Sequence, residues 1–282
     1  MVKEKTLKKL GGGCFSLTFL LHLKNKEYVL KCPSQKGRFS HKRWFFHIQK
    51  EILFLKEYVP RQRQIVLPKI IEVSDDYIIQ KKIEGVPLTE ELYERLSLSE
   101  QKNIVKQLAF FFFKLHQKTA QDISVNSPKG MFLRGIQKFF DKDELYLYKT
   151  YRLLLKKNPQ SYVYSCLCIS DFKSSHILYN LKTKKMGLID FGSIHYSVPE
   201  SEFILKNPIR SRLSLRMLKD IVSIYNRLQK GDIISWERLK SHLILYALKE
   251  VYTPYLNKEI LPREKERLRK ILYEFVEKVE QL

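Results

Sequence analysis

Two aspartates in the third quarter of the chain, Asp171 and Asp190, have a setting and spacing that could support chemistry. Asp171 follows an apolar run, and Asp190 follows residues 187–189, a short β-like segment. Between the two acids, apolar segments flank the turn-forming stretch 180–185, a pattern that predicts a hairpin. One carboxylate precedes the first strand of this hairpin and the other follows the second strand, so both lie at the same end of the hairpin. Such a pair suits a site in which one carboxylate handles a hydroxyl proton and the other holds Mg²⁺.

The residues around these aspartates match a known pair of motifs. Residues 171–178, DFKSSHIL, resemble the D-x-K-x-x-N catalytic loop of protein-kinase-like enzymes, and residues 189–192, IDFG, resemble their metal-binding D-F-G. The resemblance implies that Asp171 accepts the proton of the substrate hydroxyl and that Lys173 contacts the γ-phosphate. It also implies that Asp190 binds the Mg²⁺ that bridges the β- and γ-phosphates of ATP.

The match departs from the family pattern at two places. His176 stands where most of these enzymes have an Asn that binds the second metal, so the resemblance assigns His176 to the metal site. Ile169 and Ser170 stand where a His or Arg usually precedes the catalytic Asp. These departures keep open a non-catalytic pseudokinase, or anion-binding scaffold.

The composition favours a folded, basic protein with an anionic partner. Hydrophobic residues make up 44% of the 282 residues, which is enough for a sizeable core. The 52 Lys and Arg residues against 30 Asp and Glu give a formal net charge of +22. A surplus this large favours an anionic partner, such as a nucleotide, a phosphorylated glycan, an acidic membrane surface or a nucleic acid. No nucleic acid is expected, because the sequence contains none of the usual recognition motifs.

Four cysteines in a chain of this length do not suggest a disulfide scaffold. Cys166 and Cys168 lack C-x-x-C spacing and have no second pair, so the sequence predicts two packed thiols rather than a zinc site. His116 has no second ligand at metal spacing, which predicts a structural role. The start of the chain is basic without an apolar signal segment, and no apolar run approaches the ~20 residues that span a bilayer. We expect a cytoplasmic protein, with a peripheral position on the inner membrane face left open.

The N-terminal third resembles the nucleotide-binding lobe of kinases. Gly11, Gly12 and Gly13 lie between β-like runs, where backbone amides could approach phosphate oxygens. Residues 28–31, YVLK, resemble the V-A-I-K strand, whose Lys, here Lys31, pairs with the α- and β-phosphates.

A partner for this lysine follows in the sequence. Apolar residues at three- and four-residue steps predict a helix over 41–58. Glu51 lies in the middle of this helix, where kinases place the Glu that pairs with the strand Lys, and Glu57 is the alternative.

Residues 65–73 and 77–83 read as two further strands and complete a five-stranded sheet. The run YIIQKKIEGVPL resembles the hinge of small-molecule kinases, which implies that backbone groups near Lys81 and Ile83 bind adenine. We therefore predict an α+β, bilobal protein-kinase-like fold. Its N-lobe, residues 1–82, is a five-stranded antiparallel sheet with one helix, and its C-lobe, residues 83–282, is mainly helical around the catalytic hairpin.

The C-lobe is predicted to begin with helices over 89–96 and 97–118, the second opened by the capping box of Ser97 and Glu100. The four phenylalanines of 110–113 are expected in the core. Residues 122–160 form an aromatic and basic insertion, and residues 262–282 form a charged amphipathic helix whose role stays open.

The segment after Gly192 bears on the substrate class. Val198-Pro199-Glu200 follows almost at once, which leaves little room for the peptide-binding platform of protein kinases. Several basic residues nearby could hold an anionic substrate: Arg210, Arg212, Arg216 and Lys219.

The last third is similar to the bacterial lipopolysaccharide core kinases that act on heptose or 3-deoxy-manno-octulosonic acid (Kdo). It shares their K-D helix, at Lys219 and Asp220, and Arg238 and Tyr246 match an Arg followed two turns later by a Tyr. The resemblance implies an ATP- and Mg²⁺-dependent phosphotransferase acting on a sugar hydroxyl of an anionic glycan or lipid-linked sugar. An aminoglycoside- or choline-type small-molecule kinase and an atypical Ser/Thr protein kinase remain alternatives.

Overall fold

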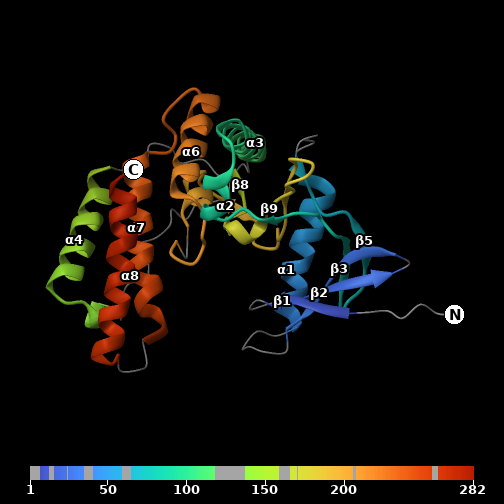
Figure 1. Ribbon diagram of the computed structural model, residues 1–282, viewed down its shortest axis with the longest axis horizontal. Helices are drawn as coiled ribbons and strands as arrows, with labels where there is room; N and C mark the ends of the chain where they lie inside the picture. The colour runs from blue at the N-terminus through green and yellow to red at the C-terminus, as the bar shows by residue number, and fades with distance from the viewer. Residues whose placement is uncertain are drawn as a thin grey trace. The chain divides into compact units, whose positions relative to one another are not determined.

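The computed structural model describes residues 7–12, 16–23, 25–34, 41–58, 65–117, 137–158, 166–169, 171–205, 208–255 and 260–282. Contacts divide the chain into two compact units (Figure 1). The first unit comprises Met1–Pro87 and His176–Ile194, and the second comprises Leu88–Ser175 and His195–Leu282. The hairpin that carries Asp190 therefore groups with the N-terminal residues. The lobe boundary near residue 82 stays a prediction.

The first unit contains the predicted five-stranded antiparallel sheet. Its strand order is β1-β2-β3-β6-β5, and each neighbouring pair is antiparallel. A register shift near Gly11 interrupts the pairing of the first two strands. The strands are β1 (Leu7–Gly12), β2 (Ser16–Leu23), β3 (Lys26–Pro33), β5 (Ile70–Val73) and β6 (Ile78–Lys81).

One long helix packs on this sheet. Helix α1 (His41–Leu53) buries Trp44, Ile48 and Ile52 in a core cluster that includes Ile78 of β6. The three- and four-residue spacing of these side chains places them on one helical face. The last predicted turn differs in form, because residues Phe54–Tyr58 make a π-helix.

The hairpin expected around residues 180–185 is present. Strand β9 (Ile177–Tyr179) pairs with β10 (Met186–Leu188), and Asn180 closes the turn through its side-chain oxygen, which accepts from the amides of Lys182 and Thr183. Two short segments complete a second sheet of order β4-β10-β9-β7, namely β4 (Ile65–Val66) and β7 (Val86–Pro87). The single strand predicted over 65–73 is therefore wrong. Its two parts belong to different sheets and are separated at Pro68, which lacks the amide that a continuing ladder needs.

The second unit is mainly helical. Its helices are α2 (Glu90–Arg95), α3 (Leu98–His116), α4 (Lys142–Lys157), α5 (Glu200–Phe203), α6 (Leu215–Gln229), α7 (Trp236–Tyr252) and α8 (Pro262–Glu280). Short 3-10 turns lie at Gln137–Phe139, Ser174–His176 and Thr253–Tyr255. A two-stranded ladder joins β8 (Cys166–Cys168) to β11 (His195–Ser197) in antiparallel register.

Local signals explain where these helices lie. The predicted capping box of Ser97 and Glu100 opens α3. Phe111 and Phe112 are buried as expected, whereas Phe110 is exposed. Helix α7 packs against both α4 and α8, and the three lie side by side in Figure 1. The amphipathic tail thus buries its apolar face, including Leu272, within this layer. Among the described residues, none of the helices combines the length and apolar character needed to cross a bilayer.

Candidate functional site

The predicted ion pair between Lys31 and Glu51 is present in the first unit. The Lys31 Nζ atom lies 2.8 Å from each carboxylate oxygen of Glu51, whose side chain is fully buried. Gln80, on the neighbouring strand β6, donates a further hydrogen bond to Glu51 Oε1 at 2.8 Å. Burial alone would lower the pKa of Lys31, but the Glu51 and Asp190 carboxylates outweigh it and raise that pKa. Lys31 is therefore a fixed cation. Glu57, the alternative partner, is exposed.

Asp190 lies near the same lysine. It follows β10 directly, in left-handed backbone conformation with a φ of 67°, which is uncommon for a residue other than glycine and often marks a functional site. Its Oδ1 atom is 3.6 Å from Lys31 Nζ. The first unit thus brings the strand lysine and the D-F-G aspartate together, as the sequence predicted, from positions 159 residues apart (190 − 31).

Two imidazoles contact the Asp190 carboxylate. His176 Nε2 lies 3.2 Å from Oδ2, and His47 Nε2 lies 3.9 Å from Oδ1. Burial would raise the pKa of Asp190, but the charge of Lys31, followed by the two histidines, holds it well below its usual range. The side chain is nevertheless 37% exposed, so it offers an ionised, accessible carboxylate.

The two predicted metal residues differ in how well they suit Mg²⁺. An ionised carboxylate oxygen such as that of Asp190 is the type of ligand that Mg²⁺ prefers. The imidazole of His176 is a better ligand for transition metals than for Mg²⁺. At 3.2 Å from Oδ2, His176 can instead donate a hydrogen bond that orients Asp190.

Sequence reasoning missed His47, Gln80 and the packing role of Gly192. A Cβ atom added to Gly192 would collide with the imidazole ring of His47, so glycine lets that histidine approach. His47 precedes Glu51 by four residues, which places both on one helical face. That spacing was the available signal.

The glycine and hinge predictions have mixed outcomes. Gly11 and Gly12 lie within β1 rather than in a turn, and Gly13 lies outside the described residues. At the hinge, the Lys81 amide donates to the Lys69 carbonyl at 2.8 Å, so this amide is already engaged. Ile83 packs on the hairpin, because a Cβ added at Gly187 would meet its side chain.

Asp171 and Lys173 belong to the second unit. Lys173 Nζ lies 3.0 Å from Asp171 Oδ2, and each side chain is a little over one third exposed. The intervening Phe172 is buried and meets the ring of Phe112 edge-on, with centroids 5.0 Å apart. The Ser174 amide donates to the Ser211 carbonyl at 3.1 Å. The contacts of Phe172 and Ser174 thus hold the loop in place, while the side chains of Asp171 and Lys173 remain accessible.

Two of the four basic residues predicted for substrate binding have side-chain partners within the second unit. Arg210 pairs with Glu250 at 3.4 Å, and Lys219 contacts the backbone carbonyl of Leu282. Arg238 is largely buried and donates to Glu200 at 2.9 Å, which indicates a structural role. The Lys249 ammonium group lies over the ring of Tyr246, 5.4 Å from the ring centroid.

Comparison with known proteins identifies the fold. No protein-family model matches the sequence. The GDP complex of wild-type aminoglycoside 2'-phosphotransferase-IIIa is similar with a TM-score of 0.69 and 16% identity, over 98% of this chain and 93% of that one. ADP-bound aminoglycoside phosphotransferase APH(2'')-Ib gives a TM-score of 0.64 and 19% identity, over 98% and 94%. A thermostable mutant of APH(4)-Ia with ADP and hygromycin B gives 0.57 and 14%, over 97% and 94%. The chain therefore has the bilobal kinase-like fold that its sequence predicted.

Proposed function

We propose that this protein is an ATP-dependent phosphotransferase whose acceptor is a sugar hydroxyl. The observation that carries the proposal is the position of Lys31 Nζ, 2.8 Å from Glu51 and 3.6 Å from Asp190. A buried cation beside an accessible, ionised carboxylate suits the binding of a nucleoside triphosphate together with its metal ion. The solved structures cited above contain ADP or GDP, which supports nucleotide binding by a chain of this fold.

The proposed roles follow from what phosphoryl transfer requires, which is mainly positioning and charge neutralisation. Lys31, held by Glu51, orients the α- and β-phosphates near the glycine segment. Backbone groups near Lys81 and Ile83, other than the engaged Lys81 amide, receive adenine. Asp190 holds the metal, with His176 as a second ligand or as the donor that orients it. Mg²⁺, when bound, would neutralise charge on the β- and γ-phosphates. Asp171 accepts the proton of the acceptor hydroxyl, and Lys173 offsets charge on the γ-phosphate.

Net charge favours an anionic acceptor over a cationic one. Similar structures are described as complexes of aminoglycoside phosphotransferases with streptomycin and ATP, or with gentamicin. Aminoglycosides carry ammonium groups, and a chain with a net charge of +22 repels polycations and attracts polyanions. We therefore place the acceptor in a phosphorylated glycan such as the heptose or Kdo region of lipopolysaccharide core. A substrate of that kind would also bring the protein to an anionic membrane surface.

Radiolabelled ATP tests the reaction and its acceptor together. Purified protein is offered lipopolysaccharide, an aminoglycoside mixture or a polypeptide mixture, and the labelled product is identified. Label in the glycan supports the proposal, and label in aminoglycosides supports the small-molecule alternative that the fold similarity favours. Label in polypeptide, or in no acceptor while the protein is folded, contradicts a sugar kinase.

One variant tests the assignment of Asp171. Asp171→Asn should lower turnover by ~10²–10⁴-fold, as expected when a general base is lost, while ATP affinity stays near that of the unchanged protein. Asp232→Asn provides a matched control, because Asp232 is an exposed aspartate of the same unit. Turnover within a few fold of the control would remove Asp171 from the mechanism.

A further inference from the structure

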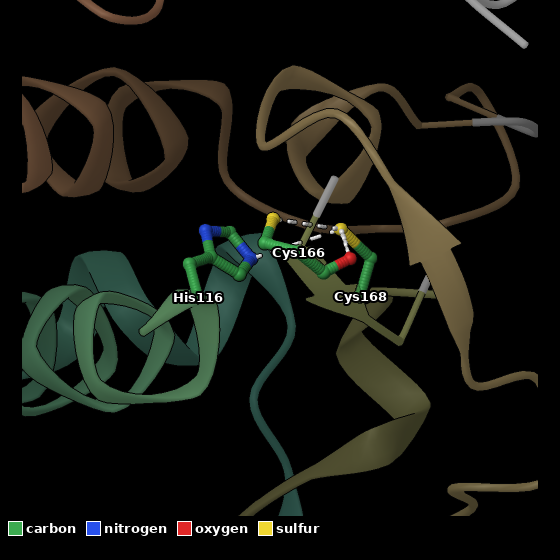
Figure 2. A group of neighbouring side chains, drawn as sticks. All are labelled: His116, Cys166 and Cys168. Carbon is green, nitrogen blue, oxygen red and sulfur yellow. Dashed lines mark hydrogen bonds between the residues drawn. The ribbon is translucent and has the colours of Figure 1, made fainter. Parts of the chain in front are cut away.

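Three potential metal ligands, none of them assigned to phosphoryl transfer, meet in the core of the second unit. His116, Cys166 and Cys168 are at most 1% exposed, and their ligand atoms all lie within 4.8 Å of one another. Figure 2 shows the His116 ring facing the two sulfur atoms. The sequence shows no second ligand for His116 at metal spacing, but the fold places two thiols beside it. Its partners lie 50 and 52 residues away in the sequence, outside the reach of spacing motifs.

We propose that His116, Cys166, Cys168 and Glu202 form a structural zinc site. Two thiolates and an imidazole are the donors that structural zinc sites use most, and a carboxylate is an accepted fourth ligand. The proposal goes beyond phosphoryl transfer and does not depend on it.

The secondary structure brings the ligands together. Alternate residues of a strand point to one face, so Cys166 and Cys168 of β8 present their sulfurs together. His116 is the last residue of α3, and Glu202 lies in α5, soon after the partner strand β11. Four ligands from three elements would tie this part of the core together.

The distances among His116, Cys166 and Cys168 suit zinc with little movement. The two sulfur atoms are 3.7 Å apart, and His116 Nε2 lies 3.9 Å from Cys168 Sγ. A tetrahedral ion with bonds of ~2.3 Å to sulfur and ~2.0 Å to nitrogen separates two sulfurs by about 3.8 Å, and a sulfur from a nitrogen by about 3.5 Å.

The other ring nitrogen of His116 has the partner that a metal ligand needs. Its Nδ1 atom lies 2.8 Å from the hydroxyl oxygen of Tyr225, which is fully buried. A histidine that binds metal through one nitrogen usually donates a hydrogen bond from the other, which fixes the tautomer and the orientation of the ring. When the Tyr225 oxygen accepts a hydrogen bond from Nδ1–H, Nε2 of a neutral His116 carries no proton, and its lone pair can bind a metal.

Glu202 supplies a second, independent observation that favours a bound cation. It is 1% exposed, and its Oε2 atom accepts from the Ile169 amide at 2.7 Å and lies 3.7 Å from His116 Nε2. Its Oε1 atom is buried and has no hydrogen-bond partner among the described residues. A protonated His116 would neutralise the charge but would leave Oε1 unpaired, a costly arrangement for a carboxylate. It would also direct an N–H at sulfurs, which are weak acceptors.

Zinc binding would be balanced by loss of the two thiol protons to solvent, with a bond to zinc formed by each sulfur. Within the protein, zinc would act on the residues next to the site. Glu202 also holds the Ile169 amide, two residues before Asp171, so the ion would fix the strand from which the candidate catalytic loop starts.

Metal content gives the first test. The full chain, purified without a histidine tag or chelator, should contain about one zinc per chain by mass spectrometry of the elements. The double variant Cys166→Ser/Cys168→Ser should lose at least about nine tenths of that zinc. Cys32→Ser is the matched control, since Cys32 is a free thiol of the first unit, and it should retain the metal.

A second measurement keeps the proposal testable if the double variant does not fold. Cobalt(II) exchanged into the unaltered protein should give the intense near-ultraviolet charge-transfer absorption of thiolate ligands together with the visible bands of a tetrahedral site. Folded protein that carries no zinc and takes up neither zinc nor cobalt would overturn the proposal, and would leave a buried His116–Glu202 pair beside packed thiols. A disulfide between Cys166 and Cys168, or zinc retained in the folded double variant, would overturn it too.

Discussion

Two polar clusters, one in each unit, use similar side chains in opposite ways. The first-unit cluster comprises Lys31, Glu51, His176 and Asp190, and the second-unit cluster comprises His116, Cys166, Cys168 and Glu202. Each contains an imidazole beside a carboxylate. The side chain of Asp190 is 37% exposed, whereas that of Glu202 is fully buried. The first cluster can therefore exchange a ligand with solvent, and the second can only keep what it binds as the chain folds.

The same comparison separates charge compensation within the protein from compensation by a ligand. In the first-unit cluster the protein supplies its own cation, Lys31, so the buried Glu51 carboxylate is paired without any ligand. In the second-unit cluster one Glu202 oxygen has no partner among the described residues. A buried group left in that state indicates a missing ion or water rather than a finished interior.

The largest expected effect comes from removing the internal cation of the first-unit cluster. Lys31→Met leaves Glu51 buried with Gln80 as its remaining side-chain donor among the described residues, so the free energy of unfolding should fall by about 3–5 kcal/mol, as for other broken buried ion pairs. Urea unfolding measures it. The double variant Lys31→Met/Glu51→Leu should recover most of the loss, because no charge is then left unpaired. A double variant no more stable than Lys31→Met would show that the pair is not the cause.

The next prediction exchanges the two carboxylates for amides. Asp190→Asn should lower phosphotransfer by ~10²–10³-fold, as for loss of one electrostatic contact in the transition state, with little change in thermal unfolding. Glu202→Gln should do the reverse, lowering stability by about 1–3 kcal/mol while folded molecules keep their activity. Turnover and melting temperature are measured on both variants. Equal effects of the two substitutions on both quantities would remove the distinction between an exchangeable and a sealed site.

A third imidazole, that of His242, is buried without a proposed metal ion, and its burial makes the stability of the protein depend on pH. Burial, followed by the charge of Arg238, lowers the pKa of His242 to about 3, and neither ring nitrogen has a hydrogen-bond partner in the described part of the chain. Because the unfolded chain binds this proton near pH 6.5 and the folded chain does not, stability from His242 is present above that pH. It is lost as the pH falls towards 3.

This linkage should cost about 2 kcal/mol between pH 7 and pH 5. His242→Leu should remove that part of the acid sensitivity, as measured by urea unfolding at both pH values. His22→Leu is the control, since His22 lies on the sheet of the first unit with a side chain 42% exposed. An unchanged difference between the two pH values in His242→Leu would contradict the assignment.

The smallest expected effects distinguish two glycines of the first unit. Gly192→Ala places a methyl group against the His47 ring, so the histidine must move away from Asp190, at a cost of about 1–3 kcal/mol in stability. Gly11→Ala meets nothing within 4 Å and should change stability by no more than about 0.5 kcal/mol. Thermal unfolding separates them. A loss of ATP affinity in Gly11→Ala at unchanged stability would support its predicted place beside the phosphates.

What the sequence predicted well rests on local signals. The hairpin follows from a polar turn between apolar runs, and the start of α3 from its capping box. The pairing of Lys31 with Glu51 was predicted by a family resemblance rather than by spacing, and the structure contains it.

What the sequence could not predict depends on contacts between distant segments. The parallel pairing of β4 with β10 joins Ile65 to Met186, and no local pattern specifies such a partner. The approach of His116 to the thiols of β8 has the same origin. A π-helical turn follows helix α1, and in it Phe54 stacks on Phe191 with ring centroids 4.4 Å apart. The spacing of apolar residues predicts an α-helix there and gives no sign of this tertiary contact.

The short strand β4 has a consequence for how the chain matures. Together with β7, it borders the hairpin and makes the first unit discontinuous along the polypeptide. A ribosome would have to synthesise Met186–Leu188 before Ile65 and Val66 could find their neighbour. The amino-terminal sheet therefore emerges long before its companion, and joining sequence-distant pieces of this kind is slow. Until the hairpin has been synthesised, the unpaired β4 and β7 segments would be open to chaperones or to wrong partners.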